Sequence, residues 1–197
     1  MADSPSNPAR RRFLTGAASA VGAVGVGFAA VPFLSSFQPS ARAEAAGAPV
    51  DVNVAELSPG QMTTVEWRGR PIYVVHRTQR MIDALPELND RLSDPDSEVA
   101  TQQPPFAENI YRAREERYLV VVGLCTHFGC APNYRPEVAP ADLGDDWRGG
   151  FFCPCHGSRF DLAGRVYRGM PAPTNLEVPE YVITDDVIRV GEIEETA

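Results

Sequence analysis

The sequence contains no lysine, because all 18 of its basic residues are arginines. Acidic residues outnumber them and give a formal net charge of −8. Residues 45–197 alone carry 14 arginines against 24 acidic residues, a net charge of −10. Since nucleic-acid binding requires a basic surface, this balance excludes nucleic acid as a partner. An acidic domain of this kind suits a basic protein partner.

Charge is absent from one long stretch, residues 13–37. A helix rises about 1.5 Å per residue and the core of a bilayer is about 30 Å thick, so this stretch can cross a membrane with some tilt. Its many alanines and glycines favour close packing on other membrane helices. A cleaved signal peptide is the alternative, with 41–43 as an A-x-A site, but its apolar region usually has only about 7–15 residues. We therefore expect a retained membrane anchor over 13–37.

The residues before this stretch, 1–12, are polar and end in three arginines, 10–12. Positively charged flanks remain in the cytoplasm, so we expect a single-pass protein with its N-terminus in the cytoplasm and its body outside. The run from Arg10 to Leu14 is similar to the twin-arginine export signal, R-R-x-F-L. That resemblance implies a bacterial inner membrane and a periplasmic body, exported after it has folded around a cofactor.

Residues 38–50 are rich in alanine, proline and glycine and are interpreted as a flexible hinge linker. The body, 51–197, is predicted to be mostly β. Helical spacing occurs over 79–92 but is interrupted at Pro86, and 93–117 is predicted to be irregular. Apolar-rich segments predict strands at 62–67 and 71–77, joined as a hairpin, and at 118–124, 150–153, 165–168, 176–178 and 181–190.

Cysteine and histidine are scarce, and they gather in two short segments. All four cysteines and two of the three histidines lie in 125–130 (CTHFGC) and 153–158 (CPCHGS). Such concentration indicates a metal site, a disulfide or both. A C-x-H in one loop and a C-x-x-H in the other can present four ligands from facing loops. The third histidine, His76, lies in an apolar run and is interpreted as a strand residue.

These segments contain the motifs C-T-H-x-G-C and C-P-C-H-G-S in full, and the chain thereby resembles the Rieske iron–sulfur family. The resemblance implies one [2Fe–2S] cluster, to which Ser158 donates a hydrogen bond and at which neutral imidazoles raise the potential to about −150 to +300 mV. It also implies a disulfide between Cys130 and Cys155. The implied metal ligands are Cys125 and Cys153 on one iron, and His127 and His156 on the other.

Two other interpretations of the cysteines and histidines start from the residues alone. One is a closed, redox-silent zinc site with two cysteines and two histidines, in a periplasmic interaction module. Such a site leaves the remaining two cysteines without a use. The other is a thiol–disulfide oxidoreductase, but the second segment has C-x-C rather than C-x-x-C. Both are weaker than the cluster interpretation.

Residues 169–173, Gly-Met-Pro-Ala-Pro, form what is here named the Pro loop. It resembles the loop that covers the cluster in bacterial Rieske subunits of ubiquinol–cytochrome c oxidoreductase, the cytochrome bc complex. The usual form there is G-P-A-P, so Met170 is one residue more. This resemblance implies an antiparallel β-sandwich head with a small cluster-binding subdomain at about 124–175, together with one N-terminal transmembrane helix.

The same resemblance implies an enzyme subunit of the respiratory chain. The head would oxidise quinol at a cytochrome b subunit, with His156 as the catalytic residue that accepts a hydrogen bond from quinol. It would then swing on 38–50 and pass one electron to a cytochrome c-type haem subunit, within a dimeric complex. Residues expected around the cluster are Phe128, Phe160, Gly169, Met170 and Pro171.

Two features depart from the family pattern. Phe160 stands where a tyrosine hydroxyl usually donates to a ligand sulfur, which predicts a lower potential. Phenylalanine at this position is frequent in the small Rieske subunit of periplasmic arsenite oxidase, which is the alternative function. The segment between the motifs, 131–152, is also longer than usual and carries Asp142, Asp145 and Asp146.

Overall fold

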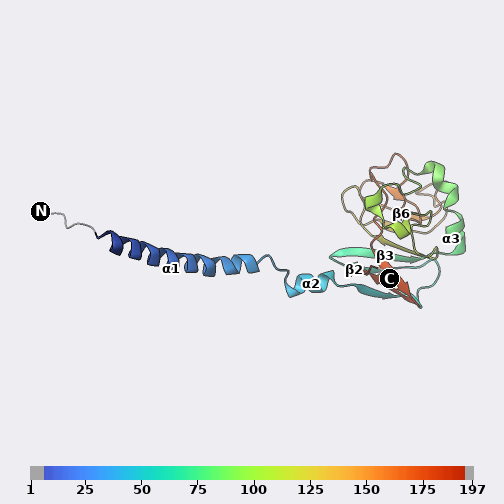
Figure 1. Ribbon diagram of the computed structural model, residues 1–197. Helices are drawn as coiled ribbons and strands as arrows, with labels where there is room; N and C mark the ends of the chain where they lie inside the picture. Colours follow the sequence, from blue (N-terminus) through green and yellow to red (C-terminus); the bar gives the residue numbers. More distant parts are fainter. Residues whose placement is uncertain (1–6, 194–197) are drawn as a thin grey trace. The chain divides into compact units, whose positions relative to one another are not determined.

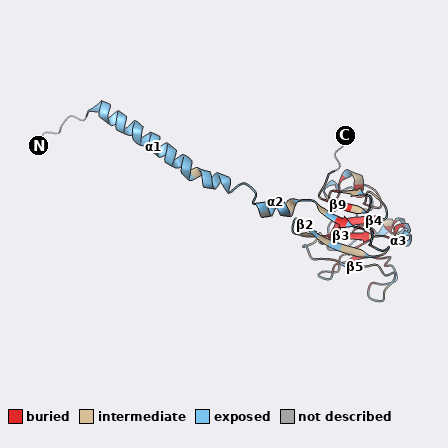
Figure 2. Cartoon of the chain, turned by 90° about the horizontal axis from the view of Figure 1, so that it is seen from below, coloured by how far each residue is buried: buried red, intermediate tan, exposed pale blue. Residues whose placement is uncertain are grey.

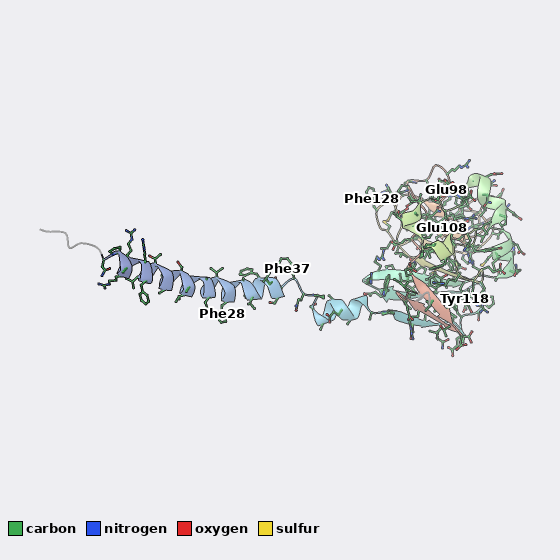
Figure 3. The ribbon with its side chains drawn as sticks, in the orientation of Figure 1. Phe28, Phe37, Glu98, Glu108, Tyr118 and Phe128 are labelled. Carbon is green, nitrogen blue, oxygen red and sulfur yellow. A yellow bond between two sulfur atoms is a disulfide. The ribbon has the colours of Figure 1, made fainter. Side chains whose placement is uncertain are left out.

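A computed structural model describes residues 7–193, which divide into two units between Ala45 and Ala46 (Figure 1). The first unit holds helix α1 (Pro8–Ser35), whose N-terminus is capped by the side chain of Asn7. Over its whole described length α1 buries no residue (Figure 2). Apolar side chains such as Phe28, which is 77% exposed, project from it (Figure 3). The helix is long and apolar enough to cross a membrane, and it begins five residues before the predicted segment.

Helix α2 (Ala41–Gly47) lies within the segment predicted as a linker. The sequence analysis interpreted the alanines of this segment as typical of a flexible linker. Alanine is also the best helix former, and it is the commonest residue in α2. Residues 36–40 and 48–49 on either side of α2 are not helical.

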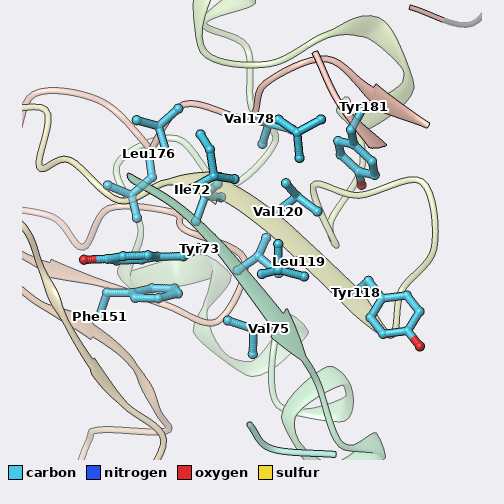
Figure 4. Packing of buried hydrophobic residues seen from close by; sticks show 14 of the residues in the cluster. Ile72, Tyr73, Val75, Tyr118, Leu119, Val120, Phe151, Leu176, Val178 and Tyr181 are labelled. Carbon is cyan, nitrogen blue, oxygen red and sulfur yellow. The ribbon is translucent and has the colours of Figure 1, made fainter. Parts of the chain in front are cut away.

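The head contains three antiparallel three-stranded sheets, which confirms the mostly β prediction. In spatial order, the sheets are β1 (Val50–Asn53), β9 (Val187–Val190) and β8 (Tyr181–Thr184); β2 (Met62–Trp67), β3 (Arg70–His76) and β4 (Tyr118–Val122); and β5 (Asn133–Arg135), β6 (Gly150–Phe152) and β7 (Arg159–Phe160). The sheet of β1, β9 and β8 and the sheet of β2, β3 and β4 contribute to one buried core, which includes Ile72, Leu119 and Tyr181 (Figure 4).

The predicted hairpin is β2–β3, closed by a two-residue turn at Arg68 and Gly69. Both turn residues have positive φ, 53° and 71°, as a type I′ turn requires. Strand β4 is buried at every position, and His76 ends β3 with its ring against that of Tyr118. The sheet therefore delivers the chain to Cys125 through a fully buried strand.

Helical structure in the head is short, as the proline-rich sequence predicts. Pro86 separates α3 (Gln79–Asp83) from the 3-10 helix η1 (Pro86–Arg91). The polar segment after η1 is irregular apart from η2 (Ala100–Gln102) and η3 (Pro105–Ala107).

Two strand predictions were wrong or incomplete. Residues 176–178 form no strand, because their backbone bonds with three separate segments: Leu176 with Gly164, Glu177 with Val122, and Val178 with Gln102. Residues 165–168 form only isolated bridges. The sequence analysis did not predict β1, β5 and β7, which have four, three and two residues.

A buried ion pair fixes the turn after β7. Asp161 and Arg165 lie 2.7 Å apart, and both side chains are fully buried. Asp161 also accepts the backbone N–H groups of Ala163 and Arg165, while Arg165 donates to the carbonyl of Leu85. The pair thus joins this turn to the start of η1.

We predict that Asp161→Asn lowers the free energy of unfolding by about 3 kcal/mol or more, because it leaves the Arg165 guanidinium buried without its counter-charge. Denaturant unfolding of the head would measure this loss. Asp51→Asn is the control, since Asp51 pairs with Arg189 at the exposed surface and should matter far less. Equal losses in the two variants would contradict the prediction.

Candidate metal centre

Two loops with the same backbone pattern carry the cysteine–histidine motifs. In the first loop (residues 125–130), Cys125 N–H donates to Cys130 O and Gly129 N–H donates to Cys125 O, both at 2.8 Å. In the second loop (residues 153–158), Cys153 N–H donates to Ser158 O at 2.8 Å, and Gly157 N–H donates to Cys153 O at 2.9 Å. The glycine in each loop has a positive φ, 75° and 78°, which a side chain would strain.

Tyr73 of β3 contacts the segments that lie next to both loops. Its ring stacks on Phe151, two residues before Cys153, with centroids 5.9 Å apart (Figure 4). Its hydroxyl donates to Pro132 O, just after the first loop, and burial raises the pKa of this hydroxyl so that it keeps its proton. A Cβ at Gly123 would come within 2.4 Å of the ring, so only glycine fits before the first loop. Sequence analysis missed Tyr73, which carries no motif signal.

The four cysteines divide into two pairs. Cys130 and Cys155 form a disulfide with an S–S distance of 2.08 Å, in agreement with the prediction. Cys125 and Cys153 are free and buried. The Cys153 sulfur lies within 4.8 Å of both disulfide sulfurs, but those two are already bonded to each other. Only Cys125 and Cys153 therefore remain as thiol ligands.

The two histidines lie side by side at the tips of the loops. Their ring centroids are 4.7 Å apart at an interplanar angle of 81°. His156 is exposed, whereas Nδ1 of His127 is buried and has no hydrogen-bond partner among the residues described. Phe128 is 78% exposed and packs against His127 at 4.1 Å (Figure 3).

These features fit a metal cluster. The pKa of the Cys125 thiol is raised, chiefly by burial, although hydrogen bonds from the backbone of His127 and from Ser158 favour its thiolate. A buried thiolate beside a second thiol is stable only when a cation is bound. The buried, unpartnered nitrogen of His127 likewise needs a partner to bind.

The Pro loop is tied to both cysteine loops. The hydroxyl of Thr126 donates to Thr174 O at 2.7 Å, and Ala172 N–H donates to Ser158 Oγ at 3.0 Å. Gly169 has a φ of 73°, Met170 is half-buried and Pro171 is exposed. Thr126 belongs to the first motif, but the sequence analysis assigned it no role.

Phe160 of β7 is fully buried opposite Phe151. It belongs to the same buried cluster as Cys125 and Cys153. Phe160 therefore shares one buried cluster with the two free cysteines, while the positions expected for Gly169 and Pro171 remain predictions.

Comparison with known sequences identifies the two parts of the chain separately. Residues 1–40 match a family model described as the ubiquitinol-cytochrome C reductase Fe-S subunit TAT signal. Residues 94–181 match the Rieske [2Fe-2S] domain. The cofactor is accordingly a [2Fe–2S] cluster, and the zinc interpretation is not supported.

Several relatives that match most of the chain carry the name ubiquinol-cytochrome c reductase iron-sulfur subunit. The protein of that name from Allochromatium vinosum is 55% identical, covering 94% of this chain and 90% of its own. Those from Blastochloris viridis and Bradyrhizobium diazoefficiens are 44% and 42% identical over at least 96% of this chain and 98% of their own. The chain belongs to this family.

The fold of this iron–sulfur subunit has a solved counterpart. A chain of a structure titled "Hyperthermophilic respiratory Complex III" matches it with a TM-score of 0.50 at 23% identity, covering 90% of this chain and 98% of its own. At that identity the likeness supports the fold alone.

We predict that Ser158→Ala lowers the midpoint potential of the subunit by about 60 mV. A hydrogen bond to a charged sulfur contributes about 1.5 kcal/mol, which is about 60 mV for one electron, and it favours the more negative, reduced state. Protein-film voltammetry would measure the shift. Ser97→Ala is the control, because Ser97 is a buried serine whose hydroxyl has no partner in the described chain. An unchanged potential in Ser158→Ala would contradict the assignment.

We predict the opposite shift for Phe160→Tyr, which adds a hydroxyl to the buried cluster that contains Cys125 and Cys153. The new donor should raise the midpoint potential by a comparable amount, about 60 mV at most. The same voltammetry measures it, with Phe151→Tyr as the matched change on the neighbouring strand. An unchanged or lower potential would show that a hydroxyl on the ring at position 160 does not donate to a ligand sulfur.

Proposed function

We propose that this chain oxidises quinol at a cytochrome b subunit and passes one electron to a cytochrome c-type haem subunit. The observation that carries this proposal is the likeness to subunits of that name over 94% of the chain, with both motif loops folded against each other. When bound, the cluster supplies a one-electron redox couple. The alternative of an arsenite oxidase subunit rests on Phe160 and on the twin-arginine signal, and none of the relatives named above supports it.

Four side chains would hold the cluster. Cys125 and Cys153 are the two thiols left free by the disulfide, and they would bind one iron. His127 and His156 would bind the other, because their rings are adjacent and a buried nitrogen of His127 has no partner among the described residues. The hydroxyl of Ser158 would steady a ligand sulfur.

His156 would be the catalytic residue. Its ring is exposed at the tip of the second loop, where a quinol hydroxyl can donate a hydrogen bond to it and then transfer its proton. Phe128 lies 6.1 Å from this ring and offers an exposed apolar surface for docking on the cytochrome b subunit. The proton and the electron thus leave the quinol at one edge of the head.

The remaining segments would place the head at its partners. Residues 1–12 would stay in the cytoplasm of a bacterium, 13–37 would anchor the chain in the inner membrane, and 51–197 would form the periplasmic head. The disulfide supports an oxidising compartment. Residues 38–50 would act as the hinge that lets the head reach both partners in a dimeric complex, with the non-helical residues beside α2 allowing the movement.

We predict that the chain co-purifies with b-type and c-type haem subunits, and that Phe128→Ala lowers quinol oxidation about tenfold in that complex. An exposed aromatic anchor at a contact typically contributes more than about 1 kcal/mol. Steady-state assays with quinol and cytochrome c would measure the rate. Electron paramagnetic resonance of the reduced complex would verify that the cluster is intact.

Ile193→Ala is the matched control, because Ile193 is a similarly exposed apolar residue, at 68%, elsewhere on the head. It should leave the rate unchanged. Failure to isolate the chain with haem subunits, or an equal effect of both variants, would overturn the proposal.

A further inference from the structure

The segment between the two cysteine loops folds into a closed loop around Trp147. Ala139 N–H donates to Trp147 O at 2.9 Å and closes residues 139–147 into one unit. Inside it, Leu143 N–H and Gly144 N–H both donate to Pro140 O. The indole N–H of Trp147 donates to Arg135 O at 3.1 Å, which fixes the ring. This unit, residues 139–147, is named the platform.

The platform has an apolar inner face and a charged outer face. Trp147 is 1% exposed and its ring stacks on Tyr167, with centroids 6.1 Å apart and an interplanar angle of 19°. Leu143 is buried in the same small cluster, which also contains Leu88 and Leu92. The acidic residues point outward, where Asp142 pairs with Arg135 and Asp146 with Arg91. The inner face of this segment is therefore part of the packed interior of the head.

Met170 of the Pro loop contacts this cluster and a second one. It packs against the cluster of Trp147 and Tyr167, and also against the main core that contains Cys125, Cys153 and Ala172. Met170 is therefore a side chain of the Pro loop that packs on the cluster to which the platform contributes Leu143 and Trp147. A methionine suits this place because its flexible thioether fills gaps between differently shaped surfaces.

The second cysteine loop is attached to the same platform. Phe152, directly before Cys153, packs against the cluster of Trp147. Arg159, directly after Ser158, donates to Leu143 O at 3.1 Å. Arg159 thus links the platform to one end of the second loop. At the other end, Phe152 packs on the cluster to which the platform contributes Leu143 and Trp147.

We propose that Trp147 is a positioning residue that acts through Met170 to hold the Pro loop on the two cysteine loops. The contact maintains the hydrogen bond from Ala172 N–H to Ser158 Oγ, and so keeps the Ser158 hydroxyl directed at the sulfur of Cys125. The proposal deepens the function proposed above, because it concerns the same site, but it does not depend on quinol being the substrate.

The test is hydrogen exchange of the Ala172 amide in the full-length chain within its complex. We expect Trp147→Ala and Met170→Ala each to speed this exchange about tenfold, since each removes the same contact that keeps the loop closed. Combining both changes should add nothing beyond the larger single effect. Trp147→Phe and Met170→Leu should restore slow exchange, and the midpoint potential should move only in the two alanine variants.

Ile188→Ala is the control, because Ile188 is fully buried in β9 of another sheet. It should lower the unfolding temperature without changing exchange at Ala172. Additive effects of Trp147→Ala and Met170→Ala, or exchange as fast in Ile188→Ala, would overturn the proposal. If Trp147→Ala does not accumulate, the half-buried Met170 decides the matter alone, since unchanged exchange in Met170→Ala also overturns it. Loss of quinol oxidation with slow exchange would count against the proposed function only.

Discussion

The disulfide between Cys130 and Cys155 is the constraint on which the site depends. It joins two loops that are far apart in the sequence, and it removes two of the four cysteines from metal binding. What remains is one buried thiol and one histidine on each loop, with matching backbone hydrogen bonds around both. Each loop closes on itself through Gly129 or Gly157. Tyr73 of β3 contacts the segments beside both loops, and the disulfide fixes the separation between the loops.

Sequence analysis predicted this arrangement well because its signals are local and chemical. The cysteines, histidines and glycines of the two motifs each have a specific chemical or conformational role. The same is true of Arg68 and Gly69 in the type I′ turn. Prediction failed where structure depends on distant partners. Residues 176–178 look like a strand, yet they bond with three unrelated segments. Tyr73 contacts Phe151 and Pro132, which lie beside the two cysteine loops, but nothing in the surrounding sequence distinguishes it from another core residue of β3.

Two departures, the additional residue of the Pro loop and the longer segment between the motifs, were separate observations in the sequence, and the structure packs both on one apolar cluster. Met170, the additional residue of the Pro loop, packs on the cluster that Trp147 of the longer inter-loop segment helps to form. No periodicity links positions 147 and 170, so their relation could not be derived from sequence. Each departure would be costly alone, since an unsupported methionine or an uncovered tryptophan would expose apolar surface.

The absence of lysine acquires a structural meaning inside the head. Within residues 7–193, three arginines are fully buried but only one carboxylate, Asp161, is buried with them. Burial lowers the pKa of Arg77 and Arg112 to about 10, so both remain charged at neutral pH, and they spread their donors over backbone carbonyls. Arg112 bonds with the carbonyls of Ala163 and Leu176, one on each side of the Pro loop. A lysine could not replace it, because an ammonium offers three donors from one point and readily loses its proton when buried. The segments that flank the Pro loop therefore require the guanidinium of Arg112. The loop itself is attached through Met170 and through the hydrogen bond to Ser158.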